Sequence, residues 1–226
     1  EAQACALIRE SVHLARQARE DYLAENPAAG PLLVAGSVGP YGAYLADGSE
    51  YRGDYQRSDD VFQEFHRPRI AALVEGGVDL LACETLPNFA EISALAELLT
   101  AYPRARAWFS LTLRDSEHLS DGTPLRDVVA LLADYPQVVA LGINCIALEN
   151  TTAALQHLHS LTTLPLVVYP NSGEQYDAVS KTWHHHGEHC AQLADYLPQW
   201  QAAGARLIGG CCRTTPKDIA ELNEQR

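Results

Sequence analysis

The sequence predicts an α/β protein whose strands belong to a (β/α)8 barrel, the TIM barrel fold. Short apolar runs typical of buried parallel strands alternate with stretches of helical periodicity along the chain. The runs start 27 to 47 residues apart, the spacing of βα units with a few longer loops. Polar residues or cysteines follow several runs, at the strand ends where a barrel assembles its active site. No G-x-G-x-x-G turn follows a run, which disfavours an open dinucleotide-binding sheet.

The first predicted element is an amphipathic helix over residues 6–25, in which Ile8, Val12 and Ala15 recur at helical spacing. An apolar run at 32–37, ended by glycine and proline, predicts the first strand. The later elements keep the same order, with helices near 58–76, 88–100, 124–134, 149–160 and 188–203 and strands at 79–85, 107–113, 138–145, 165–170 and 206–212.

These elements make six strands, each reached through a helix, which is two units short of a complete barrel. The sequence contains no methionine and opens within a helix. We therefore expect residues 1–226 to form a single, N-terminally incomplete barrel domain, with the first two βα units upstream of Glu1. The strands at 32–37 and 206–210 should then lie on either side of a gap instead of pairing.

The charge of the chain is strongly acidic, with 16 Lys and Arg against 29 Asp and Glu and a formal net charge of −13. Such a surface repels phosphate backbones and anionic lipids, so we expect neither nucleic acid nor membranes as partners. No apolar run approaches the roughly 20 residues that cross a bilayer, and the N-terminal stretch lacks the apolar core of a signal peptide. The sequence predicts a cytoplasmic protein that acts on small molecules.

The six cysteines point to metal binding or catalysis, since no export signal favours disulfides. Cys145 ends one predicted strand, and Cys211 and Cys212 end another, so the three thiols should meet at the same end of a barrel. Three thiolates with no obvious fourth protein ligand match a catalytic Zn²⁺ site that keeps one position open for substrate. Neighbouring strand residues face opposite sides, but Gly209 and Gly210 permit the backbone to leave strand geometry there.

The other cysteines have simpler interpretations. Cys83 lies within a strand, where packing is the usual role, and Cys5 and Cys190 fit small buried residues. The tract His184-His185-His186, with His189 and Cys190 nearby, is compatible with metal binding. Its position in a long polar loop favours a solvated loop over a second metal site.

Five segments resemble the zinc-dependent homocysteine S-methyltransferases, and closest among them the short bacterial enzymes that use S-methylmethionine. These segments, which span nearly the whole chain, are Gly36-Ser37-Val38-Gly39-Pro40-Tyr41-Gly42, Ala82-Cys83-Glu84-Thr85, Gly142-Ile143-Asn144-Cys145, Tyr169-Pro170-Asn171-Ser172-Gly173-Glu174 and Gly209-Gly210-Cys211-Cys212. One departure is that the family's initial strand with an Asp-Gly motif is not found.

The resemblance implies a (β/α)8 barrel in which Cys145, Cys211 and Cys212 bind zinc and Glu84 holds the amino group of homocysteine. It also implies methyl transfer from a sulfonium donor, S-methylmethionine or S-adenosylmethionine, to the zinc-bound thiolate of homocysteine, giving methionine. A thiol is mostly protonated at neutral pH, and metal coordination would turn it into a nucleophile without any protein acid or base.

Three candidate residues keep two interpretations each. Glu84 could bind substrate or serve as a carboxylate at a helix N-terminus. Asn144 could orient substrate or a metal ligand, or satisfy local backbone groups. Ser37 could shape the rim of the pocket, or belong to a turn without further function.

Two other functions stay open. A phosphate-handling barrel aldolase or isomerase could use Gly209-Gly210 as a phosphate loop, although the only lysines, Lys181 and Lys217, lie in a polar loop and on the last helix. A non-catalytic fragment could bind structural zinc if Cys83 or a loop histidine supplied a fourth ligand.

Overall fold

The fold is built on one parallel sheet of six strands, β1 (Ala35–Val38), β2 (Leu80–Leu86), β3 (Ala107–Leu111), β6 (Val138–Asn144), β7 (Leu166–Tyr169) and β10 (Ala205–Ile208). A computed structural model of the chain describes residues 2–172, 174–177, 180–184 and 192–225. The strands pair in chain order, each parallel to the next. All their carboxyl ends therefore lie at one edge of the sheet, as in a (β/α)8 barrel.

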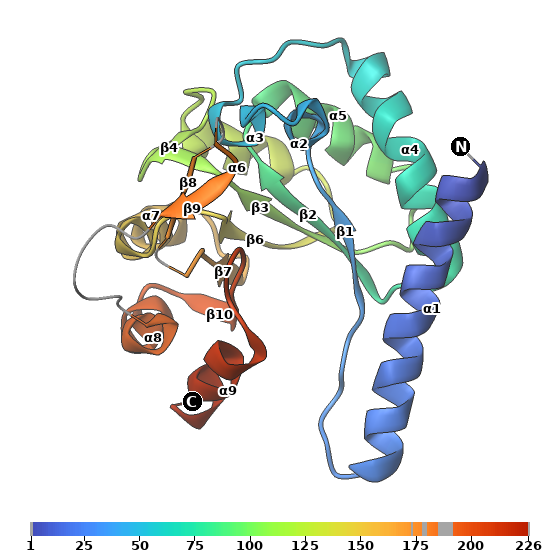
Figure 1. The fold of residues 1–226 in the computed structure, drawn as a ribbon. Helices are drawn as coiled ribbons and strands as arrows, with labels where there is room; N and C mark the ends of the chain where they lie inside the picture. Colours follow the sequence, from blue (N-terminus) through green and yellow to red (C-terminus); the bar gives the residue numbers. More distant parts are fainter. Residues whose placement is uncertain (1, 173, 178–179, 185–191, 226) are drawn as a thin grey trace.

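The sheet is an open arc (Figure 1). Within the described part of the chain, β1 and β10 are its two outer strands and do not pair with each other. This confirms the expected gap between the first and last strands, and the six strands correspond to six βα units of the barrel class.

Helices form a second layer on the outer side of the arc (Figure 1). They are α1 (Ala2–Glu25), α4 (Asp59–Gly76), α5 (Phe89–Leu99), α6 (Leu125–Leu132), α7 (Leu148–Leu161), α8 (Leu193–Ala202) and α9 (Pro216–Glu224). Each of these helices packs against the next in the series, from α1 on α4 to α8 on α9. No helix in the described ranges combines the length and apolar character required to cross a bilayer.

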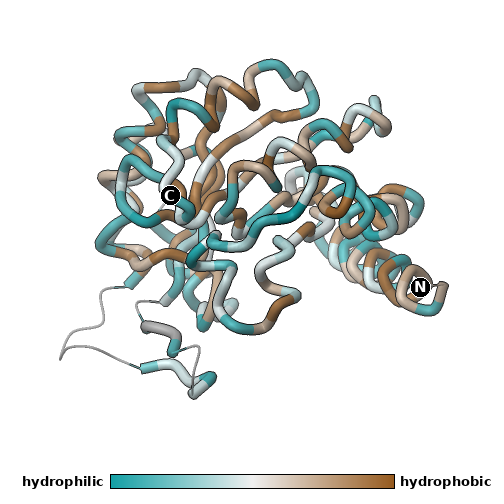
Figure 2. Tube along the Cα trace, turned by 90° about the horizontal axis from the view of Figure 1, so that it is seen from above, coloured by the Kyte–Doolittle hydropathy of each residue, from teal (hydrophilic) through white to brown (hydrophobic). Residues whose placement is uncertain are grey.

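The amphipathic pattern of α1 explains how it attaches to the rest of the domain, and its alternating hydropathy is visible in Figure 2. Val12 is buried against the last turn of α4, where a side chain at Gly76 would touch it. Arg19 binds Asp79 at the start of β2, at 2.6 Å. The outward side of α1 exposes Leu7, Leu14 and Tyr22. Ala15 of the predicted apolar face is exposed as well.

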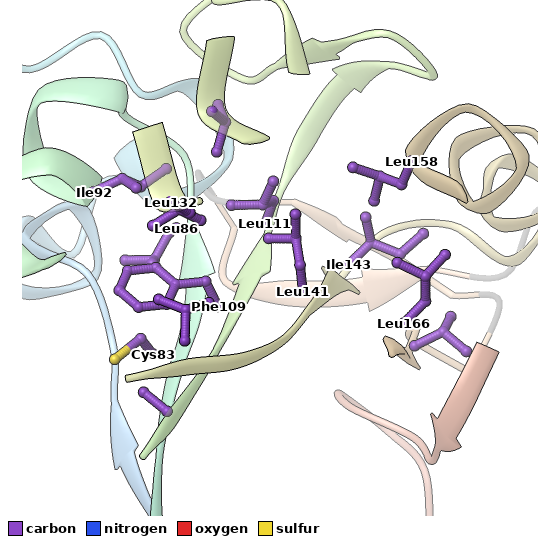
Figure 3. Packing of buried hydrophobic residues seen from close by; sticks show 14 of the residues in the cluster. Cys83, Leu86, Ile92, Phe109, Leu111, Leu132, Leu141, Ile143, Leu158 and Leu166 are labelled. Atoms are coloured by element: carbon purple, nitrogen blue, oxygen red, sulfur yellow. The ribbon is translucent and has the colours of Figure 1, made fainter. Parts of the chain in front are cut away.

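One hydrophobic core fills the space between the sheet and the helices (Figure 3). Because side chains alternate along a strand, Leu81 and Cys83 of β2 point into this core, together with Phe109 of β3. The prediction that Cys83 packs within the core is confirmed, and burial raises the pKa of its thiol. Ala82 and Glu84 lie at the alternate positions, on the other face of β2.

Every predicted strand forms, but several boundaries were wrong by a few residues. The first strand begins at Ala35 instead of 32, and the last ends at Ile208, before its cysteines. The predicted strand at 107–113 stops at Leu111. The described part of the final predicted helix starts at Leu193, and residues 188–191 lie outside the described residues.

Short elements inside the βα loops were missed. They are the helices α2 (Tyr41–Leu45) and α3 (Ser49–Arg52), the hairpin of β4 (Leu113–Asp115) with β5 (His118–Leu119), and the hairpin of β8 (Gln175–Asp177) with β9 (Thr182–His184). Elements of two to five residues are too short to establish a hydrophobic period, so sequence patterns do not reveal them.

A tight backbone contact between β6 and β7 provides a test of the sheet. An ideal Cβ at Gly142 would lie 1.7 Å from the carbonyl oxygen of Val167, far closer than any non-bonded contact allows. We expect Gly142→Ala to force these two paired strands apart and to lower the free energy of unfolding by about 1–3 kcal/mol. Urea denaturation would measure this loss.

Gly209→Ala is the matched control, because a Cβ at Gly209 would meet only the Tyr169 side chain at an ordinary 3.7 Å. Equal stability of the two variants would contradict the tight packing of β6 against β7.

Candidate metal centre

Three cysteine side chains meet at the carboxyl edge of the sheet. The Sγ of Cys145 lies 2.6 Å from the Sγ of Cys211 and 3.6 Å from that of Cys212. All three sulfurs lie within 4.8 Å of one another, and they form the one group of possible metal ligands found among the described residues. Three thiolates this close would repel each other strongly unless a cation lay among them, so the donor set fits a thiophilic metal ion.

The backbone brings these residues together by leaving regular strand geometry. Cys145 follows the last residue of β6 and has a left-handed φ of 51°. β10 ends at Ile208, so the two glycines carry the chain away from the sheet before Cys211 and Cys212. The amides of Cys145 and Cys211 donate to the carbonyls of Tyr169 and Pro170, which ties both ligand segments to the end of β7.

Gly210 is required at its position by a close contact. A Cβ there would lie 2.5 Å from the Oγ1 of Thr214. Thr214 in turn donates from Oγ1 to the carbonyl of Cys211 at 2.7 Å, which closes the turn that presents the cysteines. The predicted departure from strand geometry at the glycines is confirmed.

Asn144 holds the edge of the sheet together beneath the thiols. Its Oδ1 accepts from the Thr85 amide at 2.8 Å and from the Ser110 hydroxyl at 2.6 Å, while its Nδ2 donates to the Thr85 hydroxyl. The same Nδ2 lies 3.8 Å from the Sγ of Cys211. Asn144 therefore links three strands and also contacts one of the three sulfurs. These contacts are compatible with both interpretations of Asn144, as a group that satisfies its local surroundings and as one that orients a metal ligand.

Hydrogen bonds among the three thiols shift their pKa values in opposite directions. Hydrogen bonds from Cys145, Cys211 and Tyr51 lower the pKa of Cys212 to about 3. Hydrogen bonds to Cys211 and Cys212 raise the pKa of Cys145. For Cys211, the hydrogen bond with Cys145 lowers the pKa, but the hydrogen bond with Cys212 and burial raise it overall. Binding a metal to all three as thiolates would therefore release protons.

Glu84 occupies a polar network on the face of the sheet opposite the helices. Its carboxylate accepts from the Ser37 hydroxyl at 2.6 Å and from the Tyr169 hydroxyl at 3.0 Å. The Trp108 indole donates to the same tyrosine oxygen at 2.8 Å. Burial, together with the charge of Glu84, raises the pKa of Tyr169 and keeps it a neutral donor. Glu84 thus has partners from two other strands, which differs from the alternative role at a helix N-terminus.

The two parts of the site are connected through Thr85. This residue follows Glu84, has a left-handed φ of 62°, and makes both of its described hydrogen bonds to Asn144. The register of β2 and β3 shifts between Cys83 and Leu86, around the same residue. A local irregularity of β2 therefore couples the carboxylate to the asparagine that contacts Cys211.

A cavity of about 460 Å³ opens beside Cys145. Besides Cys145, its walls include Tyr51 of α3, Thr112, Asn171 and Glu174, for which the sequence predicted no role. Asn171 and Glu174 belong to a segment that carries the family resemblance, and that signal could have identified them. Tyr51 lies in a short helix that no sequence pattern predicts.

The alternatives to a catalytic metal site find less support. Cys83 packs in the core and does not join the three thiols, so it supplies no fourth ligand. His184 is exposed at the end of β9, whereas His185, His186, His189 and Cys190 lie outside the described residues. The aldolase or isomerase alternative would need a lysine at the site. Lys217 pairs with Glu221 on α9, and neither Lys217 nor Lys181 lines the cavity.

The fold and the site together define a class, the barrel proteins that carry a cysteine-rich metal centre at the carboxyl ends of their strands. The family model described as homocysteine S-methyltransferase matches residues 1–226. The chain belongs to the homocysteine S-methyltransferase family.

Similar proteins support this assignment. The homocysteine S-methyltransferase of Escherichia coli is 86% identical over 222 residues, covering 98% of this chain and 72% of the relative. The Bacillus subtilis homocysteine S-methyltransferase YbgG is 49% identical, with 98% and 71% covered. A crystal structure of the metallated form of E. coli homocysteine methyltransferase MmuM matches all of this chain and 72% of its own, with a TM-score of 0.91 and 77% identity.

Proposed function

We propose that this protein transfers a methyl group from a sulfonium donor to the thiolate of homocysteine and so forms methionine. S-methylmethionine and S-adenosylmethionine are the candidate donors. The convergence of Cys145, Cys211 and Cys212 at the carboxyl edge of the sheet carries the proposal, because three thiolates leave one position of a tetrahedral metal for the thiol of a substrate.

Cys145, Cys211 and Cys212 would hold the metal, which we propose to be zinc. Bound zinc would supply Lewis acidity that lowers the pKa of the substrate thiol and keeps it as a nucleophile at neutral pH. The three negative charges of the cysteine thiolates exceed the two positive charges of the ion. The substrate sulfur would therefore keep more of its electron density and be the better nucleophile. Asn144 keeps Cys211 in place through its hydrogen bond and its anchors on Thr85 and Ser110.

Glu84 would bind the ammonium group of homocysteine. Ser37 and Tyr169 would orient the carboxylate of Glu84 for this contact. Both hydroxyls donate to the Glu84 carboxylate and hold it in place. The transfer step itself needs no protein acid or base. The thiolate sulfur forms the new S–CH3 bond as that of the donor breaks, the donor leaves as a neutral thioether, and the thiol proton would already have been released to solvent. Residues 1–226 would act as one homocysteine-binding domain with small-molecule partners in the cytoplasm.

A direct assay tests the function. The zinc-loaded protein is incubated with homocysteine and, separately, S-methylmethionine, S-adenosylmethionine or betaine, and methionine is quantified. Methionine formation with a sulfonium donor is the expected result. A protein that binds zinc but makes no methionine with any of the three donors would contradict the proposed reaction.

The Glu84→Gln variant tests the amino-group site. Loss of a charged hydrogen bond is expected to reduce kcat/KM for homocysteine by about 10- to 150-fold while zinc stays bound. Steady-state kinetics with varied homocysteine would measure it, together with zinc analysis. Glu64→Gln, which removes the same charge from an exposed position of α4, is the control. An unchanged KM for homocysteine would reject this role of Glu84.

A further inference from the structure

The segment that follows β7 contributes a buried amide to the cavity beside Cys145. Asn171 lies in the cavity wall and is only 7% exposed. Its Oδ1 is buried and has no hydrogen-bond partner among the described residues. A buried carbonyl oxygen without a donor is unfavourable, so its retention in a cavity wall indicates a ligand that donates a hydrogen bond.

A buried carboxylate lies in the same wall. Glu174 is 8% exposed, and its Oε2 accepts from the Arg213 Nε at 2.6 Å and from the Ser172 hydroxyl at 3.2 Å. The Nη2 of Arg213 approaches Oε1 less closely, at 3.4 Å. Arg213 thus holds the buried carboxylate in place at the cavity.

The remaining walls also suit a cation. The phenol ring of Tyr51 lies in the same wall. The one basic side chain in the described wall is Arg52, whose guanidinium is engaged by Asp47 and Asp54. Glu84 is not part of this wall, so the cavity is distinct from the network that would hold homocysteine.

We propose that Asn171 and Glu174 bind the α-ammonium group of the methyl donor, placing its sulfonium beside the thiol site. This inference rests on the proposed function. An ammonium offers three N–H donors and a positive charge, which match one unpaired carbonyl oxygen and one buried carboxylate. A trimethylammonium donor such as betaine has no N–H group, so this site would favour sulfonium amino acids over betaine.

Kinetic constants of the zinc-loaded protein test the proposal. Asn171→Leu and Glu174→Gln should each raise the KM for S-methylmethionine about 10-fold or more, with little change in kcat or in the KM for homocysteine. Asn171→Asp keeps an acceptor at this position and should restore tight donor binding. Glu64→Gln, on exposed α4, should leave all constants unchanged.

Two comparisons separate donor binding from a structural role. Dimethylsulfoniopropionate, a sulfonium without an amino group, should be affected less than twofold by the same variants, as substrate or as competitor. Arg213→Gln removes the ion pair but keeps the carboxylate of Glu174. If that variant weakens donor binding as much as Glu174→Gln does, Glu174 acts only through its ion pair and the proposal is wrong.

Calorimetric titration with S-methylmethionine in the absence of homocysteine requires no turnover. Weaker binding of S-methylmethionine to the Asn171 and Glu174 variants would support the site even if no methionine formed. The absence of methionine would contradict only the proposed function. Methionine formation with an unchanged donor KM in both variants would overturn the site and leave the function intact. A raised KM for homocysteine instead would assign these residues to the acceptor.

Discussion

Replacement of Cys211 by serine is expected to strip the metal from the protein and to abolish methyl transfer. The Sγ of Cys211 lies 2.6 Å from that of Cys145 and receives a hydrogen bond from Asn144, so it is an integral member of the thiol group. Changes to groups that merely contact a metal ligand commonly cost 10- to 100-fold in affinity, and loss of a ligand should cost more. Elemental analysis after dialysis would measure zinc, and methionine formation would measure activity.

Cys5→Ser provides the matched control, because Cys5 lies on α1, outside the thiol group, and its Sγ donates a weak hydrogen bond to the Pro68 carbonyl at 3.9 Å. This variant should retain zinc and full activity. Stoichiometric zinc in the Cys211→Ser protein would show that the three-thiolate site is wrong.

Glu91→Ala should cause the largest loss of stability, because this carboxylate is fully buried and organises three segments. It accepts hydrogen bonds from the Tyr55 hydroxyl, from the Tyr41 amide at 2.6 Å, and from the ring of His66 at 2.7 Å. Its removal leaves buried donors without an acceptor, at an expected cost of about 3–5 kcal/mol in the free energy of unfolding. In a chain of this size, that loss lowers Tm by roughly 6–20 °C.

The same variant should also perturb the metal site at a distance. Glu91 anchors both ends of the 41–55 segment, and α3 within that segment carries Tyr51 to the cavity beside Cys145. Thermal unfolding of Glu91→Ala would measure the loss of stability. Glu64→Ala is the control, because Glu64 is exposed. A Tm within 2 °C of the parent protein would contradict the role of Glu91 as an anchor.

The sequence was informative about the sheet and its three clustered cysteines because both depend on local patterns. Buried parallel strands are continuous apolar runs, and their regular separation by helical stretches predicted six βα units. Cys145, Cys211 and Cys212 could be placed together since the carboxyl ends of parallel strands share one edge. Glu84, Asn144 and Ser37 were found mainly because their segments resemble a known family.

The sequence by itself therefore determined the class of fold, the order of the strands and the meeting of three thiols. Only the tertiary structure decided that Tyr51, Asn171 and Glu174 line one cavity, and that Ser37 and Tyr169 hold Glu84. It also decided that Thr85 and Cys145 adopt left-handed backbone conformations. These features depend on contacts between residues 47 to 85 positions apart, such as the bonds of Glu84, and no local period of hydrophobic or polar residues encodes such contacts.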